Sequence, residues 1–141
     1  MSIHPVYVIQ LAVPSTQAMR LCIAIVTHWD RRNPHVPVPI GDVYYADGCA
    51  AQGYRFAVEP NLAITRIRGY RGRTHVGNIK SHELKLFYNA LASTDLTDGP
   101  NWTFLALRRL KAHHLDIPIY GKEPVYKGLD EGRRAWEAGD D

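Results

Sequence analysis

The amino-acid sequence predicts a single α+β domain, in which a mainly antiparallel sheet of about five strands packs against two or three helices. The length of 141 residues is that of one domain. Hydrophobic residues make up 45% of the chain and charged residues 22%, as in globular proteins. Short β-branched runs fill the first half, whereas helical periodicity begins only near residue 81. We therefore expect one domain over residues 1–141.

Five short segments have the features of strands: residues 6–13, 21–27, 42–46, 54–58 and 62–68. The first two are rich in Val and Ile and predict buried strands that pair through a turn at 14–20. The other three place β-favouring residues between Gly, Pro and Asn signals, which indicates an antiparallel meander. Three prolines between residues 30 and 39 predict a surface loop.

Helices are predicted in the second half. One amphipathic helix is indicated, with Ser81 as its N-cap, by apolar residues at i, i+3, i+4 and i+7, which are Leu84, Phe87, Tyr88 and Leu91. A second helix over 101–114 is apolar nearly all round its first two turns, which is typical of a helix central to the core. A third, short helix is expected over 129–138, within a C-terminal extension formed by residues 116–141.

Charge is distributed unevenly along the chain. Residues 1–115 contain 13 Lys and Arg against 7 Asp and Glu, whereas residues 116–141 contain 4 against 7. The basic body permits binding to nucleic acid or to acidic ligands without requiring it. No stretch approaches the ~20 apolar residues of a membrane-spanning helix, no signal peptide is recognisable, and two cysteines are too few for a disulfide framework. We expect a cytoplasmic protein with no membrane partner; its oligomeric state is left open.

Polar side chains near predicted strand ends are candidates for catalysis. His28 follows directly on the second predicted strand and precedes Asp30 by two residues. Tyr44 and Tyr45 lie on the third strand and Arg55 on the fourth. A histidine near an acid or a tyrosine suffices for general acid/base chemistry, so we expect these four residues at a cleft between sheet and helices, with His28, Tyr44 and Arg55 lining a pocket. The alternative is that they are ordinary surface residues.

Motifs for cofactors and metals are not recognisable. The sequence has no glycine-rich phosphate loop, nucleophile elbow or nucleotide fingerprint. Neither His113-His114 nor the His75/His82 pair has a familiar ligand spacing. By elimination we expect neither cofactor nor metal, and a protein that binds a small organic ligand. It acts on that ligand either as a cofactor-independent cyclase, isomerase or hydrolase, or not at all.

A basic segment predicts an alternative function. No acid occurs from residue 61 to residue 81, and the candidate binding residues in this stretch are Arg66, Arg68, Arg71, Arg73 and His75. Guanidinium groups match phosphate, and an aromatic ring such as that of Tyr70 can stack on a base. This alternative is a non-catalytic interaction protein that contacts nucleic acid or an acidic protein. The same arginines also fit a solvated sheet edge that resists aggregation.

Several segments, taken in order along the chain, resemble a family of uncharacterised small fungal proteins with the permuted papain-like fold; they are residues 6–11, 21–27, 41–46, 53–56 and 101–110. In that family a His-Trp pair opens the second strand and an Asn-Cys pair opens the last core helix, which implies a histidine base and a thiolate nucleophile. This chain has no histidine around Leu21 and no cysteine around Asn101. The resemblance therefore implies a papain-like fold without that catalytic pair, used for binding or for different chemistry.

Overall fold

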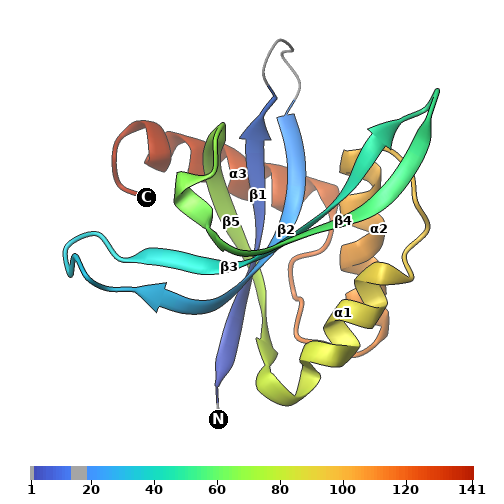
Figure 1. The fold of residues 1–141 in the computed structure, drawn as a ribbon, viewed down its shortest axis with the longest axis horizontal. Coiled ribbons are helices and arrows are strands. Elements are labelled where there is room, and N and C mark those ends of the chain that lie inside the picture. Colours follow the sequence, from blue (N-terminus) through green and yellow to red (C-terminus); the bar gives the residue numbers. More distant parts are fainter. Residues whose placement is uncertain (1, 14–18) are drawn as a thin grey trace.

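The computed structural model describes residues 2–13 and 19–141 and contains one antiparallel sheet with helices packed against it (Figure 1). The strands are β1 (Ile3–Ala12), β2 (Met19–Asp30), β3 (Val38–Cys49), β4 (Gly53–Ala63) and β5 (Tyr70–Lys80). Their order is β4-β3-β2-β1-β5, so the first four strands form a meander and β5 returns to pair with β1. The α+β class with a five-stranded sheet is confirmed.

The first four predicted strands are present, and each is longer than expected. The predicted pairing of the first two is confirmed by the register, in which Val8 lies opposite Ile23; residues 14–18 of the predicted turn lie outside the described residues. The expected fifth strand over 62–68 is wrong. There β4 ends at Ala63 and is followed by a short 3-10 helix, η1 (Ile64–Arg66). The fifth strand is β5, within the arginine-rich stretch.

Two irregularities explain why the sequence pattern did not reveal β5. The register between β1 and β5 shifts between Val6 and Tyr7 and again between Ile9 and Leu11. Each shift changes which side chains of β5 face a given side of the sheet, so buried and exposed residues do not alternate regularly. A strand without that alternation lacks its main sequence signal.

Both faces of the central strands are buried. On one face Val6, Ile23 and Ile25 pack against the helices, in a core that also contains Trp102. Strand side chains that face the other side of the sheet form a second, smaller core against Ile64 of η1. This core contains Ile9, Cys22, Ala24, Val26, Val43 and Tyr70. We call these the helix-side core and the η1-side core. This two-sided burial accounts for the continuous apolar runs of β1 and β2.

The helix side of the sheet is covered by α1 (Leu84–Ala92) and α2 (Gly99–Ala112) (Figure 1), and the third helix adds Val125 and Leu129 to the same core. The carboxylate of Asp98 caps α2 by accepting a hydrogen bond from the Asn101 N–H at 3.1 Å. Ser81, expected to cap the first helix, instead belongs to a 3-10 turn, η2 (Ser81–Glu83), and its hydroxyl donates to the Ser2 carbonyl at 3.2 Å. None of the described helices is long and apolar enough to cross a membrane.

The third helix, α3 (Lys122–Glu137), has 16 residues and is longer than expected: it begins seven residues before the predicted 129–138 helix and lies against β5. Glycines allow this close approach, because a methyl group added at Gly132 would meet the Arg73 carbonyl oxygen at 2.2 Å. The side-chain amide of Gln10 on β1 donates to the Leu129 carbonyl at 2.8 Å. The C-terminal residues are therefore packed into the domain rather than appended to it.

Candidate functional site

His28 lies near the end of β2 and is exposed. It lines an open cleft of about 510 Å³ together with Trp29 and Asp30. Its Nδ1 is 3.1 Å from the hydroxyl of Thr27. Asp30 does not contact it, because the carboxylate accepts hydrogen bonds from Arg32, which lower the pKa of Asp30 to about 2. The predicted His–Asp combination is therefore not formed, and the acid belongs to an exposed ion pair.

Tyr44 lies in the helix-side core rather than at a cleft. Its side chain is 5% exposed, and its ring is 5.6 Å from the ring of Phe87. Burial raises the pKa of Tyr44 to about 12, so the phenol is protonated at neutral pH. In the sheet Tyr44 pairs with Ile23, whereas His28 pairs with Ile40. This places the two candidates roughly 15 Å apart along the strands.

The other two candidate catalytic residues point elsewhere. Tyr45 follows Tyr44 and packs on the η1-side core. Arg55 on β4 has a side chain that is 80% exposed, and its guanidinium is 3.0 Å from the carboxylate of Asp47. His28, Tyr44 and Arg55 therefore do not line a common pocket: His28 lines an open cleft, Tyr44 is buried in the helix-side core, and Arg55 is exposed beside Asp47.

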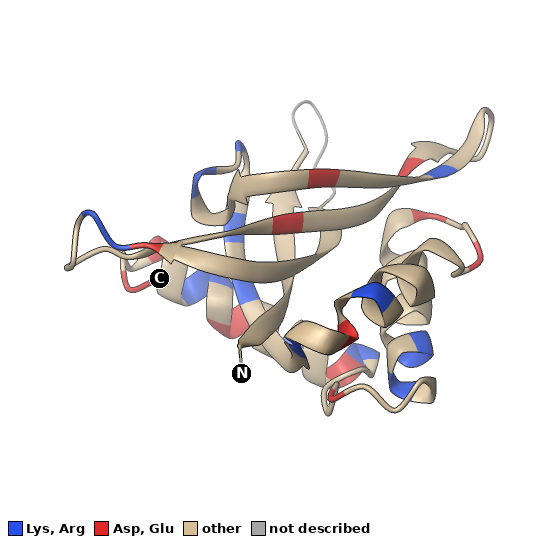
Figure 2. Cartoon of the chain, turned by 60° about the horizontal axis from the view of Figure 1, so that its bottom comes forward, with Lys and Arg blue, Asp and Glu red and all other residues tan. Residues whose placement is uncertain are grey.

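The arginine-rich segment does not form one continuous surface in the structure. Arg66 ends η1 beside a cleft of about 150 Å³, while Arg68 lines a different one of about 160 Å³. Arg71 and His75 are exposed on β5, and the His75 Nε2 is 3.0 Å from the Asn78 Oδ1. Figure 2 shows Lys and Arg spread over several elements, with Asp and Glu interspersed among them. Binding of nucleic acid or an acidic protein by this segment stays a prediction.

Arg73 differs from the other arginines of this segment because it is already paired. Its side chain is 19% exposed, and its Nη2 lies 3.1 Å from Oδ1 of Asp141, whose side chain is 7% exposed. The Tyr70 hydroxyl donates to Oδ2 of the same carboxylate at 2.6 Å. Burial and this hydrogen bond raise the pKa of Tyr70. A predicted binding residue is thus neutralised by an acid of the same chain.

Cysteine and metal chemistry receive no support from the described residues. Cys22 is buried, and desolvation raises the pKa of its thiol to about 12, which leaves it protonated and unreactive. Cys49 is exposed, and neither cysteine forms a disulfide. Within residues 2–13 and 19–141, no group of three or more His, Cys, Asp or Glu side chains is placed to hold a metal ion.

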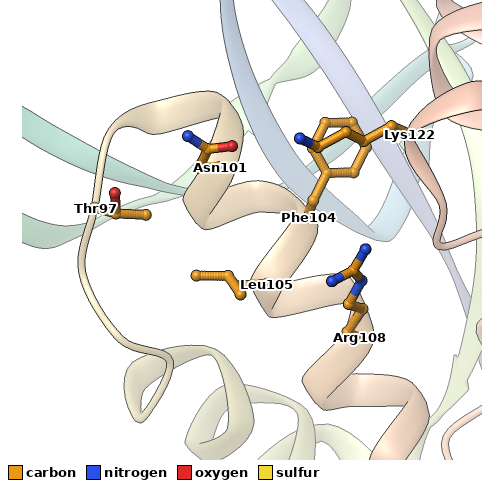
Figure 3. Close-up of a pocket in the computed structure, with 6 residues that line it drawn as sticks. All are labelled: Thr97, Asn101, Phe104, Leu105, Arg108 and Lys122. Carbon is orange, nitrogen blue, oxygen red and sulfur yellow. The ribbon is translucent and has the colours of Figure 1, made fainter.

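A pocket that the sequence did not suggest lies on α2, and we call it the α2 pocket (Figure 3). Its volume is about 300 Å³. Four of its six lining residues come from α2, one from the preceding loop and one from the start of α3; they are Thr97, Asn101, Phe104, Leu105, Arg108 and Lys122. The four from α2 are spaced at i, i+3, i+4 and i+7, so they share one stripe of the helix.

The α2 pocket combines an apolar floor with two positive charges. The Phe104 ring is 3% exposed, and the Lys122 ammonium lies 5.9 Å from its centre. Neither Lys122 nor Arg108 forms an ion pair with a described residue. The side-chain amide of Asn101 donates to Asp98 at 2.7 Å, which leaves its oxygen as an acceptor. The stripe on α2 was visible in the sequence, but its meeting with Lys122 was not.

The chain was compared with family models, with curated proteins and with solved structures, and no family model, curated protein or solved structure matches it. The resemblance to the permuted papain-like fungal family, and the cytoplasmic location, therefore stay predictions.

Proposed function

We propose that this protein binds a small organic anion, a carboxylate attached to a compact apolar body, in the α2 pocket. The observation that supports this most is the buried ring of Phe104 flanked by Arg108 and Lys122, two cations without an acidic partner among the described residues. The pocket volume of about 300 Å³ is at the small end of ligand sites, which span roughly 300–1,000 Å³.

Each lining residue has a distinct role in this proposal. Arg108 and Lys122 bind the carboxylate, since a guanidinium matches its two oxygens and an ammonium adds charge. Phe104 and Leu105 cover the apolar body, while the Asn101 oxygen accepts a hydrogen bond from a ligand hydroxyl or N–H. No His, Asp, Glu or Cys lines the pocket. This composition favours binding over general acid/base catalysis there.

The test is binding of a panel of small organic carboxylates, measured first by thermal unfolding and then by calorimetry. A ligand at about 100 times its dissociation constant adds roughly 2.7 kcal/mol to the folded state, a shift of several degrees for a domain of this size. We expect the paired variant R108Q/K122Q to weaken binding about tenfold or more, because both charge-assisted contacts are lost.

Lys127→Gln is the matched control, because Lys127 is also an exposed lysine of α3 but does not line the pocket. It changes net charge by the same amount as Lys122→Gln alone. Carboxylate binding that is equal in R108Q/K122Q and in the parent protein would contradict the proposal, as would a panel in which no compound shifts the unfolding temperature.

A second candidate function rests on the exposure of Arg66, Arg68 and Arg71, which is consistent with contact to a nucleic-acid backbone. Such binding weakens steeply with salt, and the variant R68Q/R71Q is expected to reduce the slope of log affinity against log salt by about 1 to 2. Binding that does not respond to salt, or that this variant leaves unchanged, would remove the candidate.

A further inference from the structure

A second group of hydrogen-bond donors lies on β5, away from the α2 pocket. Arg73 and Tyr70 converge on the Asp141 carboxylate, with contacts of 3.1 Å and 2.6 Å. The Arg73 guanidinium also lies 5.1 Å from the centre of the Tyr7 ring, and the Tyr70 ring is 4.8 Å from that of Trp136. Aromatic rings on two sides thus hold both donors in place, in surroundings where charge interactions are strong.

The site has more donors than Asp141 uses. Nη1 of Arg73 is buried and has no hydrogen-bond partner among the described residues, although Nη2 of the same guanidinium is paired. A buried N–H without a partner is costly, and native structures retain few of them. Asp141 therefore engages Nη2 of Arg73 and the Tyr70 hydroxyl, one oxygen for each, and leaves Nη1 of the same guanidinium without a partner among the described residues. A phosphate group presents three or four terminal oxygens in a tetrahedral arrangement, more than a planar carboxylate offers, and can accept from Nη1 as well as from the two donors that Asp141 engages.

The segment that carries Asp141 is attached to α3 through a turn of defined geometry. Gly139 has φ of 79° and donates to the Trp136 carbonyl at 3.1 Å, while the Asp140 N–H donates to the Ala135 carbonyl at 2.8 Å. These two bonds form a Schellman motif, which ends α3 and turns the chain back toward β5. Release of Asp141 breaks its contacts with Arg73 and Tyr70 and exposes to solvent a side chain that is 7% exposed in the structure.

We propose that Arg73 and Tyr70 form an oxyanion site whose preferred ligand is a phosphate group, and that Asp141 is an internal competitor that occupies this site. The ligand and Asp141 exclude each other, so phosphate binds to the form in which the acid has moved out. The apparent affinity is reduced by the fraction of molecules in the open form. This inference does not depend on the α2 pocket, since no residue is shared.

The experiment is a calorimetric titration of the full chain with inorganic phosphate. We expect Asp141→Ala to bind phosphate about tenfold more tightly than the parent, which corresponds to a site closed in about 90% of molecules. Asp140→Ala is the matched control, since Asp140 is exposed and its loss changes net charge equally; it is expected to leave the affinity within about twofold. The variant D141A/R73Q is expected to lose this gain in phosphate affinity, because the guanidinium that binds phosphate is absent.

Two further measurements keep the result specific. D141A/R108Q/K122Q is expected to bind phosphate as D141A does, because the α2 pocket is not involved. Asp141→Asn, which keeps the shape of the side chain, is expected to give part of the gain if removal of the whole side chain perturbs folding. Equal affinity of D141A, D141N and D140A would overturn the proposal, and so would a gain that survives Arg73→Gln.

Discussion

The α2 pocket and the Arg73 site both place a cation beside an aromatic ring, yet the cations of the first are unpaired among the described residues and that of the second is paired. Arg108 and Lys122 are exposed and form no ion pair within residues 2–13 and 19–141, whereas Arg73 is 19% exposed and bound to an acid from the same chain. The difference follows from desolvation. An exposed cation stays hydrated and is available to a ligand, whereas burial of a cation costs free energy unless a counter-charge is present. The comparison teaches that burial, more than residue type, decides whether a cation is available.

The largest expected effect comes from Gly132, which allows α3 to lie against β5 behind Arg73. A Cβ at this position would meet the Arg73 carbonyl oxygen at 2.2 Å, and backbone cannot yield as a side chain does. We expect Gly132→Val to lower the free energy of unfolding by about 3 kcal/mol. Denaturant titration measures the free energy of unfolding. Gly99→Ala is the control, because the nearest atom to a Cβ added at Gly99 is 3.9 Å away. Equal stability of the two variants would contradict the close approach.

A direct comparison of the two sites replaces one arginine in each. Arg73→Gln is expected to destabilise the fold by about 2 kcal/mol, because the Asp141 carboxylate loses its charged partner in a buried place. Arg108→Gln is expected to change stability by less than about 0.5 kcal/mol, as is usual for an exposed side chain. If urea titration shows similar losses for both, the contrast between a paired and an unpaired cation is wrong.

The two sites are also expected to differ at alkaline pH, since only the Arg73 site contains a buried tyrosine. The pKa of Tyr70 in the folded protein is raised above its unfolded value of about 10, so the unfolded state loses this proton first. The stability that the protonated Tyr70 contributes to the folded state is complete below pH 10. It declines as the pH rises above 10, by at most about 1.4 kcal/mol per pH unit.

Tyr44 contributes to the same decline, because its pKa of about 12 is raised by burial as well. Tyr70→Phe is therefore expected to reduce the loss of stability above pH 10 without abolishing it. The measurement is denaturant unfolding at several pH values between about 9 and 11. A slope identical to that of the parent would show that Tyr70 titrates as it does in the unfolded chain.

The smallest effect is expected at the exposed arginines of the predicted basic segment. Arg66→Gln and Arg68→Gln should each change stability by less than about 0.5 kcal/mol, since neither forms an ion pair with a described residue. Thermal unfolding of the single variants checks this. A loss near that of Arg73→Gln would mean that these side chains have buried partners.

Much of the fold was predictable from the sequence, for a local reason. The Val- and Ile-rich runs of β1 and β2 and the apolar stripe of α1 reflect burial of one element at a time, which a window of 10 or so residues records. β5 was missed because its two register shifts against β1 break the alternation. The start of α3 was missed because Pro124 and Gly128, which lower helix propensity, both lie in its first half, although Pro124 is in the first turn, where proline is tolerated.

The candidate sites divide in the same way. By itself the sequence determined the composition of the parts: a basic stretch without acids at 61–81 and an acidic C-terminal segment. Only the tertiary structure decided that Lys122 completes the α2 pocket, that Tyr44 faces the core, and that Asp141 neutralises Arg73. The physical reason is that pairing and burial depend on distances between elements far apart in the chain, and no local pattern of residues encodes those distances.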